Sequence, residues 1–185
     1  MDKKESVKFI EKAGACIVSK NIINKTWKGW LPLDIKSHLK GLYDNRLLEN
    51  ENEIRDFNES LMEVIEYNDV SVITDLCLVL DDETEQFEVM FGLIHEIESL
   101  YKNNIEEGLV CIAKAVPKMI NSAKEWVEIL HYRILNHPQV RLAYGKVLSE
   151  FDPSITISIK ELLIDIKNED PDMFSESVNE VIKSI

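Results

Sequence analysis

The sequence predicts an all-α protein, built as an irregular HEAT-like array of stacked antiparallel helical hairpins. Three observations support this prediction. From residue 50 onward, apolar residues recur at the three- and four-residue intervals of one helix face. Only 6 glycines and 5 prolines punctuate 185 residues, which is too few for the frequent turns of an all-β sandwich. Signals for helix starts fall near residues 69, 104, 138 and 171, at separations of 35, 34 and 33 residues.

Each apolar stripe predicts one helix. In chain order the stripes cover residues 54–65, 70–80, 87–101, 109–120, 126–134, 142–148, 159–166 and 174–185. None of them alternates with the two-residue period of a strand for long. Pro117 falls within or at the end of its stripe, where it should kink or end the helix.

Side chains that can accept hydrogen bonds from the free amides of a first helical turn precede several stripes. Asp152-Pro153 and Asp170-Pro171 place such a residue directly before proline, which suits the first helical position. His137-Pro138 is a weaker form of the same signal. Ser122 with Glu125, and Asn104 with Glu107, have a spacing typical of a capping box.

We expect a single domain over residues 1–185. Residues 1–44 would form an amino-terminal helix, over residues 1–24, and a connecting segment that contains Trp27 and Trp30. Residues 45–185 would form the helical array. A repeat near 34 residues suggests tetratricopeptide repeats, but their Trp, Gly, Tyr and Ala signature does not recur, so an irregular HEAT-like array fits better.

The sequence is typical of a soluble cytoplasmic protein. Glu11 and Lys12 interrupt the apolar stretch that a secretory signal would need. No uninterrupted apolar run approaches the ~18 residues that a membrane-spanning helix requires. Three well-separated cysteines among apolar neighbours, Cys16, Cys77 and Cys111, are expected to be buried free thiols in a reducing compartment.

The formal charge of -13 is concentrated in one stretch. Residues 49–107 hold 18 Asp and Glu against only Arg55 and Lys102, a local charge of -16. Such a stretch repels nucleic acid and anionic membranes and attracts a basic protein surface. The candidate partner-binding residues are therefore Glu51, Glu53, Asp56, Glu59, Asp81, Asp82, Glu83, Glu85 and Glu88. A solubilising exterior, and carboxylates that stabilise the positive end of a helix dipole, explain the same residues equally well.

No arrangement of residues indicates catalysis. The glycines stand alone, so there is no phosphate-binding loop. His95-Glu96 could begin a zinc-protease helix, but residue 99 is Ser where the second histidine should stand. His95, Glu98 and Glu88 could meet His131 across a helical hairpin and hold a metal. Polar contacts between neighbouring helices are the simpler interpretation, and we predict no catalytic residue, no cofactor and no metal.

Two runs carry a resemblance to a known family. DDETEQFEVMFGLIHEIES (81–99) and WVEILHYRILN (126–136) resemble the bacterial immunity protein 30 family, and the likeness extends over about residues 45–145. The family-like positions are Glu88, Met90, Gly92, His95, Glu98, Trp126, His131, Arg133 and Asn136. Gly92 lies in an apolar helix, where glycine costs roughly 1 kcal/mol against alanine, so we expect close helix approach there.

The resemblance implies a mostly helical, non-enzymatic protein that binds and blocks a cognate toxin encoded beside it. We expect the acidic residues to cover a basic surface of that toxin. A nuclease is one candidate, because nucleic-acid enzymes carry positive grooves. A general helical adaptor and, less favoured, a helical metal-dependent enzyme that uses His95 and His131 are the alternatives. The sequence leaves the oligomeric state open.

Overall fold

The structure is a computed structural model that describes residues 35–185. In this part of the chain it contains nine α-helices, one short 3-10 helix and no strand, which confirms the all-α prediction. The helix expected over residues 1–24, the segment with Trp27 and Trp30, and Cys16 lie outside the described residues. The extent of the single domain and the HEAT-like repeat geometry stay predictions.

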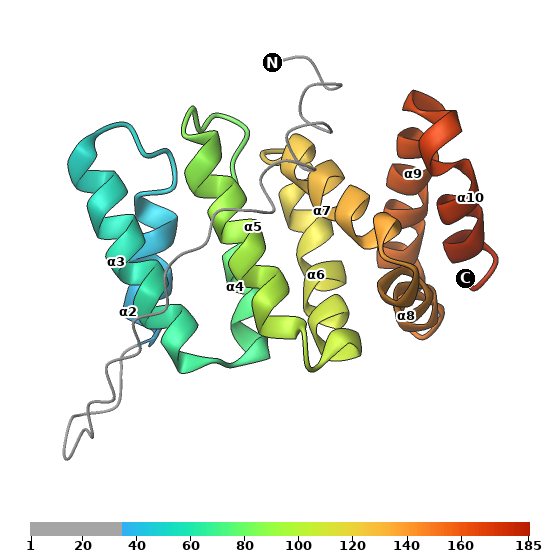
Figure 1. Ribbon diagram of the computed structural model, residues 1–185, viewed down its shortest axis with the longest axis horizontal. Coiled ribbons are helices and arrows are strands. Elements are labelled where there is room, and N and C mark those ends of the chain that lie inside the picture. The colour runs from blue at the N-terminus through green and yellow to red at the C-terminus, as the bar shows by residue number, and fades with distance from the viewer. Residues whose placement is uncertain (1–34) are drawn as a thin grey trace. The chain divides into compact units, whose positions relative to one another are not determined.

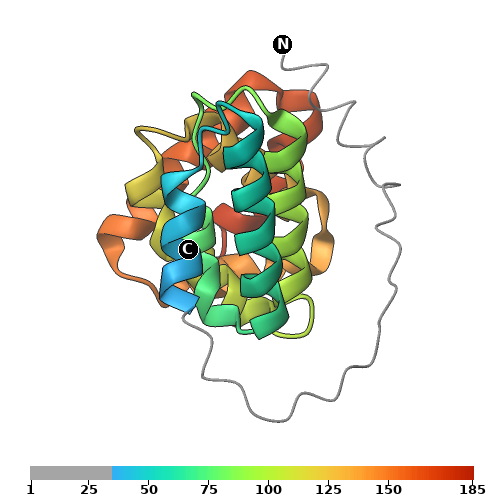
Figure 2. The same ribbon diagram turned by 90° about the vertical axis from the view of Figure 1, so that its left-hand side faces the viewer.

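The described helices stand side by side in a row, from α2 and α3 at one end to α9 and α10 at the other (Figure 1). Figure 2 looks along this row from the end where α2 and α3 lie. In chain order the elements are α2 (Ile35–Asp44), α3 (Glu51–Tyr67), η2 (Val70–Val72), α4 (Ile73–Cys77), α5 (Phe87–Tyr101), α6 (Ile105–Met119), α7 (Lys124–Asn136), α8 (Pro138–Ser149), α9 (Pro153–Glu169) and α10 (Pro171–Ile182).

The stripes locate the helices from α3 onward well, with one difference, whereas α2 corresponds to no stripe and lies in the segment expected to be a connection. The stripe over residues 70–80 does not form one continuous helix, because it divides into the 3-10 helix η2 and the five-residue helix α4. The Asp69 side chain accepts a hydrogen bond from the Ser71 amide at 2.8 Å and caps this segment. Pro117 lies inside α6, which ends two residues later at Met119.

Two of the expected caps form and two do not. Asp152 and Asp170 accept hydrogen bonds from the amides of Ser154 and Met173, at 2.9 and 3.1 Å. Proline follows each of them at the start of α9 and α10, so these two predictions are confirmed. The caps expected of Ser122 and Asn104 are wrong, since neither side chain accepts a first-turn hydrogen bond.

The core consists of the apolar faces that the stripes identified. Its largest fully buried side chains are Trp126, Tyr144, Phe57 and Phe174, which come from four different helices. Cys77 is a buried free thiol, as expected, whereas the free thiol Cys111 of α6 is only half-buried. No helix within residues 35–185 has the length and apolar character needed to cross a membrane.

Candidate functional site

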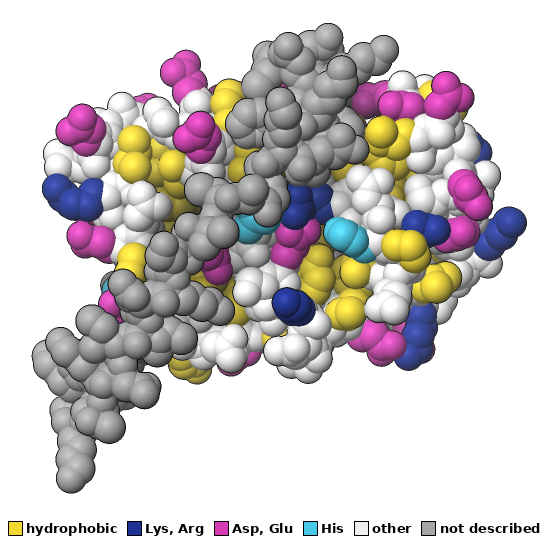
Figure 3. Space-filling view, viewed as in Figure 1, with side chains coloured by type: hydrophobic (Ala, Val, Ile, Leu, Met, Phe, Trp, Pro, Cys, Tyr) yellow, Lys and Arg dark blue, Asp and Glu magenta, His cyan; other side chains and the backbone are white. Residues whose placement is uncertain are grey.

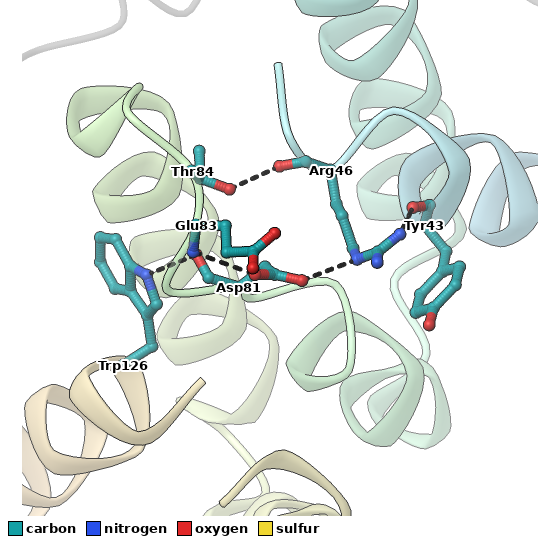
Figure 4. Close-up of polar contacts among 6 residues, drawn as sticks. All are labelled: Tyr43, Arg46, Asp81, Glu83, Thr84 and Trp126. Carbon is teal, nitrogen blue, oxygen red and sulfur yellow. Dashed lines mark hydrogen bonds and ion pairs between the residues drawn. The ribbon is translucent and has the colours of Figure 1, made fainter. Parts of the chain in front are cut away.

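The loop between α4 and α5 connects three parts of the array at one end of the helices. The Thr84 hydroxyl donates to the Arg46 carbonyl at 2.7 Å. Arg46 Nε donates to Asp81 Oδ2 at 3.0 Å, and Trp126 Nε1 donates to the Asp81 carbonyl at 3.1 Å (Figure 4). This loop therefore joins the α2–α3 connection to α7, although these segments are far apart in sequence.

Three of the nine candidate acids have structural roles. Asp81 is only 6% exposed, and its carboxylate also accepts from the Glu83 amide. Contrary to the prediction, it is therefore not part of an exposed acidic face. Asp82 accepts from the Glu125 amide at 3.2 Å and thus supplies the cap of α7 that was assigned to Ser122. Glu53 accepts from the Glu49 amide at 2.9 Å beside the capping residue of α3.

The other six acids are exposed. They are Glu51, Asp56, Glu59, Glu83, Glu85 and Glu88. Asp56 and Glu59 border a surface hollow of about 370 Å³ between α2 and α3, which also includes His38, Glu63 and the exposed Met62. Arg55 pairs with Asp56 at 3.0 Å, in an ion pair whose side chains are 60% and 51% exposed.

A bidentate ion pair joins α5 to α7. Arg133 Nε and Nη2 donate to the two Glu98 oxygens at 2.6 and 2.5 Å, with side chains only 14% and 20% exposed. Arg133 Nη2 also lies 3.4 Å from His95 Nδ1. On the face drawn in Figure 3, histidine, basic and acidic side chains gather near the middle, over α5 and α7. Three family-like residues therefore meet in one cluster.

A second hollow, of about 450 Å³, adjoins this ion pair, and we call it the Lys102 hollow. It is lined by His95, Glu98, Ser99, Tyr101, Lys102, Ile105, His137 and Val140. Sequence reasoning did not single out Ser99 or Lys102, and it noted His137 only as a helix start. The signal in the sequence that could have pointed to this hollow is Lys102, which is one of only two basic residues in the acidic stretch 49–107.

His131 is a buried structural histidine. Its Nδ1 donates to the Val127 carbonyl at 2.7 Å, and its Nε2 accepts from the Tyr144 hydroxyl at 2.9 Å. Burial lowers the pKa of His131 to about 4 and raises the pKa of the Tyr144 phenol. Because both ring nitrogens are engaged, His131 is not free to share a metal with His95. Within residues 35–185, no three His, Cys, Asp or Glu side chains are placed to hold a metal ion.

Two aromatic residues of the first family-like run pack on Trp126 of the second, while Tyr132 of the second run stacks on Phe174. Phe91 meets Trp126 edge to face at a centroid distance of 5.2 Å, and Phe87 lies 6.1 Å from the same ring. Met90, which precedes Phe91 in the chain, is also buried, while Asn136 is exposed at the last position of α7. The two runs thus form one structural unit, in which Phe87 is partly exposed at the surface.

The expectation of a close helix approach at Gly92 is wrong. A Cβ atom built at Gly92 would meet nothing within 4 Å. Close approach occurs instead at Gly108, where a Cβ would lie 2.1 Å from Tyr101 Cβ. The sequence analysis did not single out Gly108, because its contact with Tyr101 arises only when α5 and α6 pack together.

We therefore expect Gly92→Ala to stabilise the protein by up to about 1 kcal/mol, because alanine favours the helix and fills open space. Urea denaturation of both chains, followed by circular dichroism, measures this difference. Gly108→Ala is the matched control and should destabilise the protein, because its methyl group would collide with Tyr101. A destabilised Gly92→Ala variant would contradict the open environment of this position.

Comparison with known proteins agrees with the two runs identified above. No curated protein and no solved structure matches the chain. A family model described as Immunity protein 30 matches residues 44–144, which is more than half of the 185 residues. The match includes the α4–α5 loop, the Glu98–Arg133 ion pair and Trp126. The chain belongs to the immunity protein 30 family.

Proposed function

We propose that this protein binds and neutralises a cognate protein toxin without catalysing a reaction, and that its exposed acidic surface guides the encounter. Membership of the immunity protein 30 family supports the toxin as partner. The structural observation that carries the acidic-surface proposal is that seven of the nine candidate acids, Asp82 among them, are exposed, within a stretch whose formal charge is -16.

The proposed acidic surface consists of Glu51, Asp56, Glu59, Glu83, Glu85 and Glu88. Negative charges gathered on one protein raise the rate at which a positively charged partner associates with it, and added salt screens this attraction. The partner would therefore carry a basic surface. A nuclease toxin is the class we favour, because its nucleic-acid groove must be positive.

Co-expression with the products of adjacent genes tests the proposal directly. Rescue of growth by this chain, together with co-purification of the rescued product, would establish toxin neutralisation. Failure to rescue or bind any neighbouring product would contradict it and favour a general adaptor.

Charge reversal tests the acidic surface. We expect the variant Glu83→Lys, Glu85→Lys, Glu88→Lys to associate with the toxin about tenfold more slowly at low salt. The deficit should shrink as salt is added, because screening weakens attraction in the parent chain. Stopped-flow or surface-based kinetics over a range of salt concentrations measures both effects. Asp81 and Asp82 are left unchanged, since their carboxylates support the fold.

The control variant reverses three exposed acids outside the acidic stretch, Glu161, Asp165 and Asp172. It changes the total charge by the same amount and should alter the association rate much less. Equal slowing of the two variants would show that total charge, and not the acidic surface, governs association.

A further inference from the structure

We propose that the Lys102 hollow receives an acidic side chain, Asp or Glu, of the cognate toxin. This inference rests on the proposed function, because it assigns a docking point to the same partner. The hollow has a volume of about 450 Å³ and lies within the part of the chain that the family model matches.

The first argument is the charge of Lys102. It is one of only two basic residues in the acidic stretch 49–107. Its side chain is exposed, and among the described residues it has no ion-pair partner. The other basic residue, Arg55, already pairs with Asp56. Lys102 is thus a cation available to a partner where most of the surrounding sequence is negative.

The second argument is that the one carboxylate in the hollow does not oppose an incoming acid. Both Glu98 oxygens are held by Arg133, and such a bidentate pair is compact and strong. His95 Nδ1 lies 3.4 Å from Arg133 Nη2 and 3.7 Å from Glu98 Oε2. Because arginine has only donors, Nδ1 accepts in its contact with Arg133, which leaves the ring proton on Nε2. His95 therefore presents a donor, and its side chain is 39% exposed.

The third argument is the lining of the hollow around Lys102. Ile105, the first residue of α6, and His137, which lies between α7 and α8, both line it. Because α5 and α7 end here while α6 and α8 begin, the helix dipoles oppose one another, and Lys102 supplies the positive charge. Apolar atoms of Ile105 and Val140 border the same space and suit the methylene groups of Asp or Glu.

A small probe tests the hollow without the toxin. We would titrate the full chain, labelled with ¹³C in its histidine rings, with the N-acetyl amide of glutamate. The ring signals of His95 and His137 should shift saturably. The glutamine analogue at equal ionic strength should leave them unchanged, and so should the glutamate probe added to a Lys102→Met variant. Absence of a saturable shift, or an equal response to the glutamine analogue, would overturn the proposal.

The complex gives the second test, with whichever neighbouring gene product co-purifies with the parent chain. Lys102→Glu should raise Kd at least about tenfold, the change expected when a charged contact becomes repulsive. Lys118→Glu, at an exposed position 13 residues beyond Ile105 and so about 20 Å from the start of α6, makes the same charge change and should alter Kd less than about twofold.

The outcomes separate this inference from the proposed function. Unchanged affinity of Lys102→Glu would overturn the docking point while rescue by the parent chain still supported toxin neutralisation. Failure of every neighbouring product to bind would contradict toxin neutralisation, and with it the assignment of a toxin side chain to the hollow. A change in the oligomeric state of Lys102→Glu without the toxin would assign the hollow to a second copy of the chain and overturn the toxin assignment.

Discussion

Replacement of Trp126 by alanine is expected to lower the free energy of unfolding by about 3–5 kcal/mol. The indole is 1% exposed and is packed against Phe91 and Phe87, so its removal leaves a large cavity. The substitution also removes the hydrogen bond from Nε1 to the Asp81 carbonyl. This bond connects α7 to the loop that Arg46 holds, so we expect the damage to reach the α2–α3 end of the array.

Trp126→Phe separates the two contributions. It retains most of the ring packing but leaves the Asp81 carbonyl without its donor, which should cost about 1–3 kcal/mol. Urea denaturation followed by far-ultraviolet circular dichroism is the suitable measurement, because removing a tryptophan alters the fluorescence signal itself. A loss below about 1 kcal/mol in Trp126→Ala would show that the ring does not hold the two family-like runs together, since cavity costs of this size do not arise at loosely packed positions.

The sequence predicts the helices well because each one buries a single apolar face, and this face repeats with the helical period. The stripe over residues 87–101 corresponds to α5 residue for residue. Local caps such as Asp152 were also predictable, because the acceptor lies two residues before its donor. The cap of α7 was not, since Asp82 and the Glu125 amide are 43 residues apart in sequence and meet only through tertiary packing.

The candidate site was predictable to a smaller extent, because a sequence gives the charges but not their partners. Asp81 and Glu83 lie two residues apart in one acidic run, yet Asp81 is buried beside Arg46 and Glu83 is exposed. The Lys102 hollow was missed for a related reason: its residues come from α5, the start of α6 and the α7–α8 junction. Only packing of these helices places Lys102 near His137.

Acid is expected to destabilise the protein through His131. Burial lowers its pKa from 6.5 to about 4 in the folded state, whereas the unfolded chain has the ordinary value. At pH 7 the ring is mainly neutral in both states, so its titration has little effect on the free energy of unfolding. As the pH falls from about 6.5 to about 4, only the unfolded chain takes up the proton, so the free energy of unfolding declines. The full pKa difference corresponds to about 3 kcal/mol.

Comparison with His131→Gln isolates this contribution from the carboxylates that titrate in the same range. The variant loses the hydrogen bonds of the ring and should be less stable at pH 7, but its stability should fall by about 3 kcal/mol less than that of the parent between pH 6.5 and 4. Parallel curves for the parent and His131→Gln would mean that the buried ring takes up its proton in the folded state as readily as in water. The hydrogen bond from Tyr144 to Nε2 opposes such uptake, because a protonated Nε2 could no longer accept it.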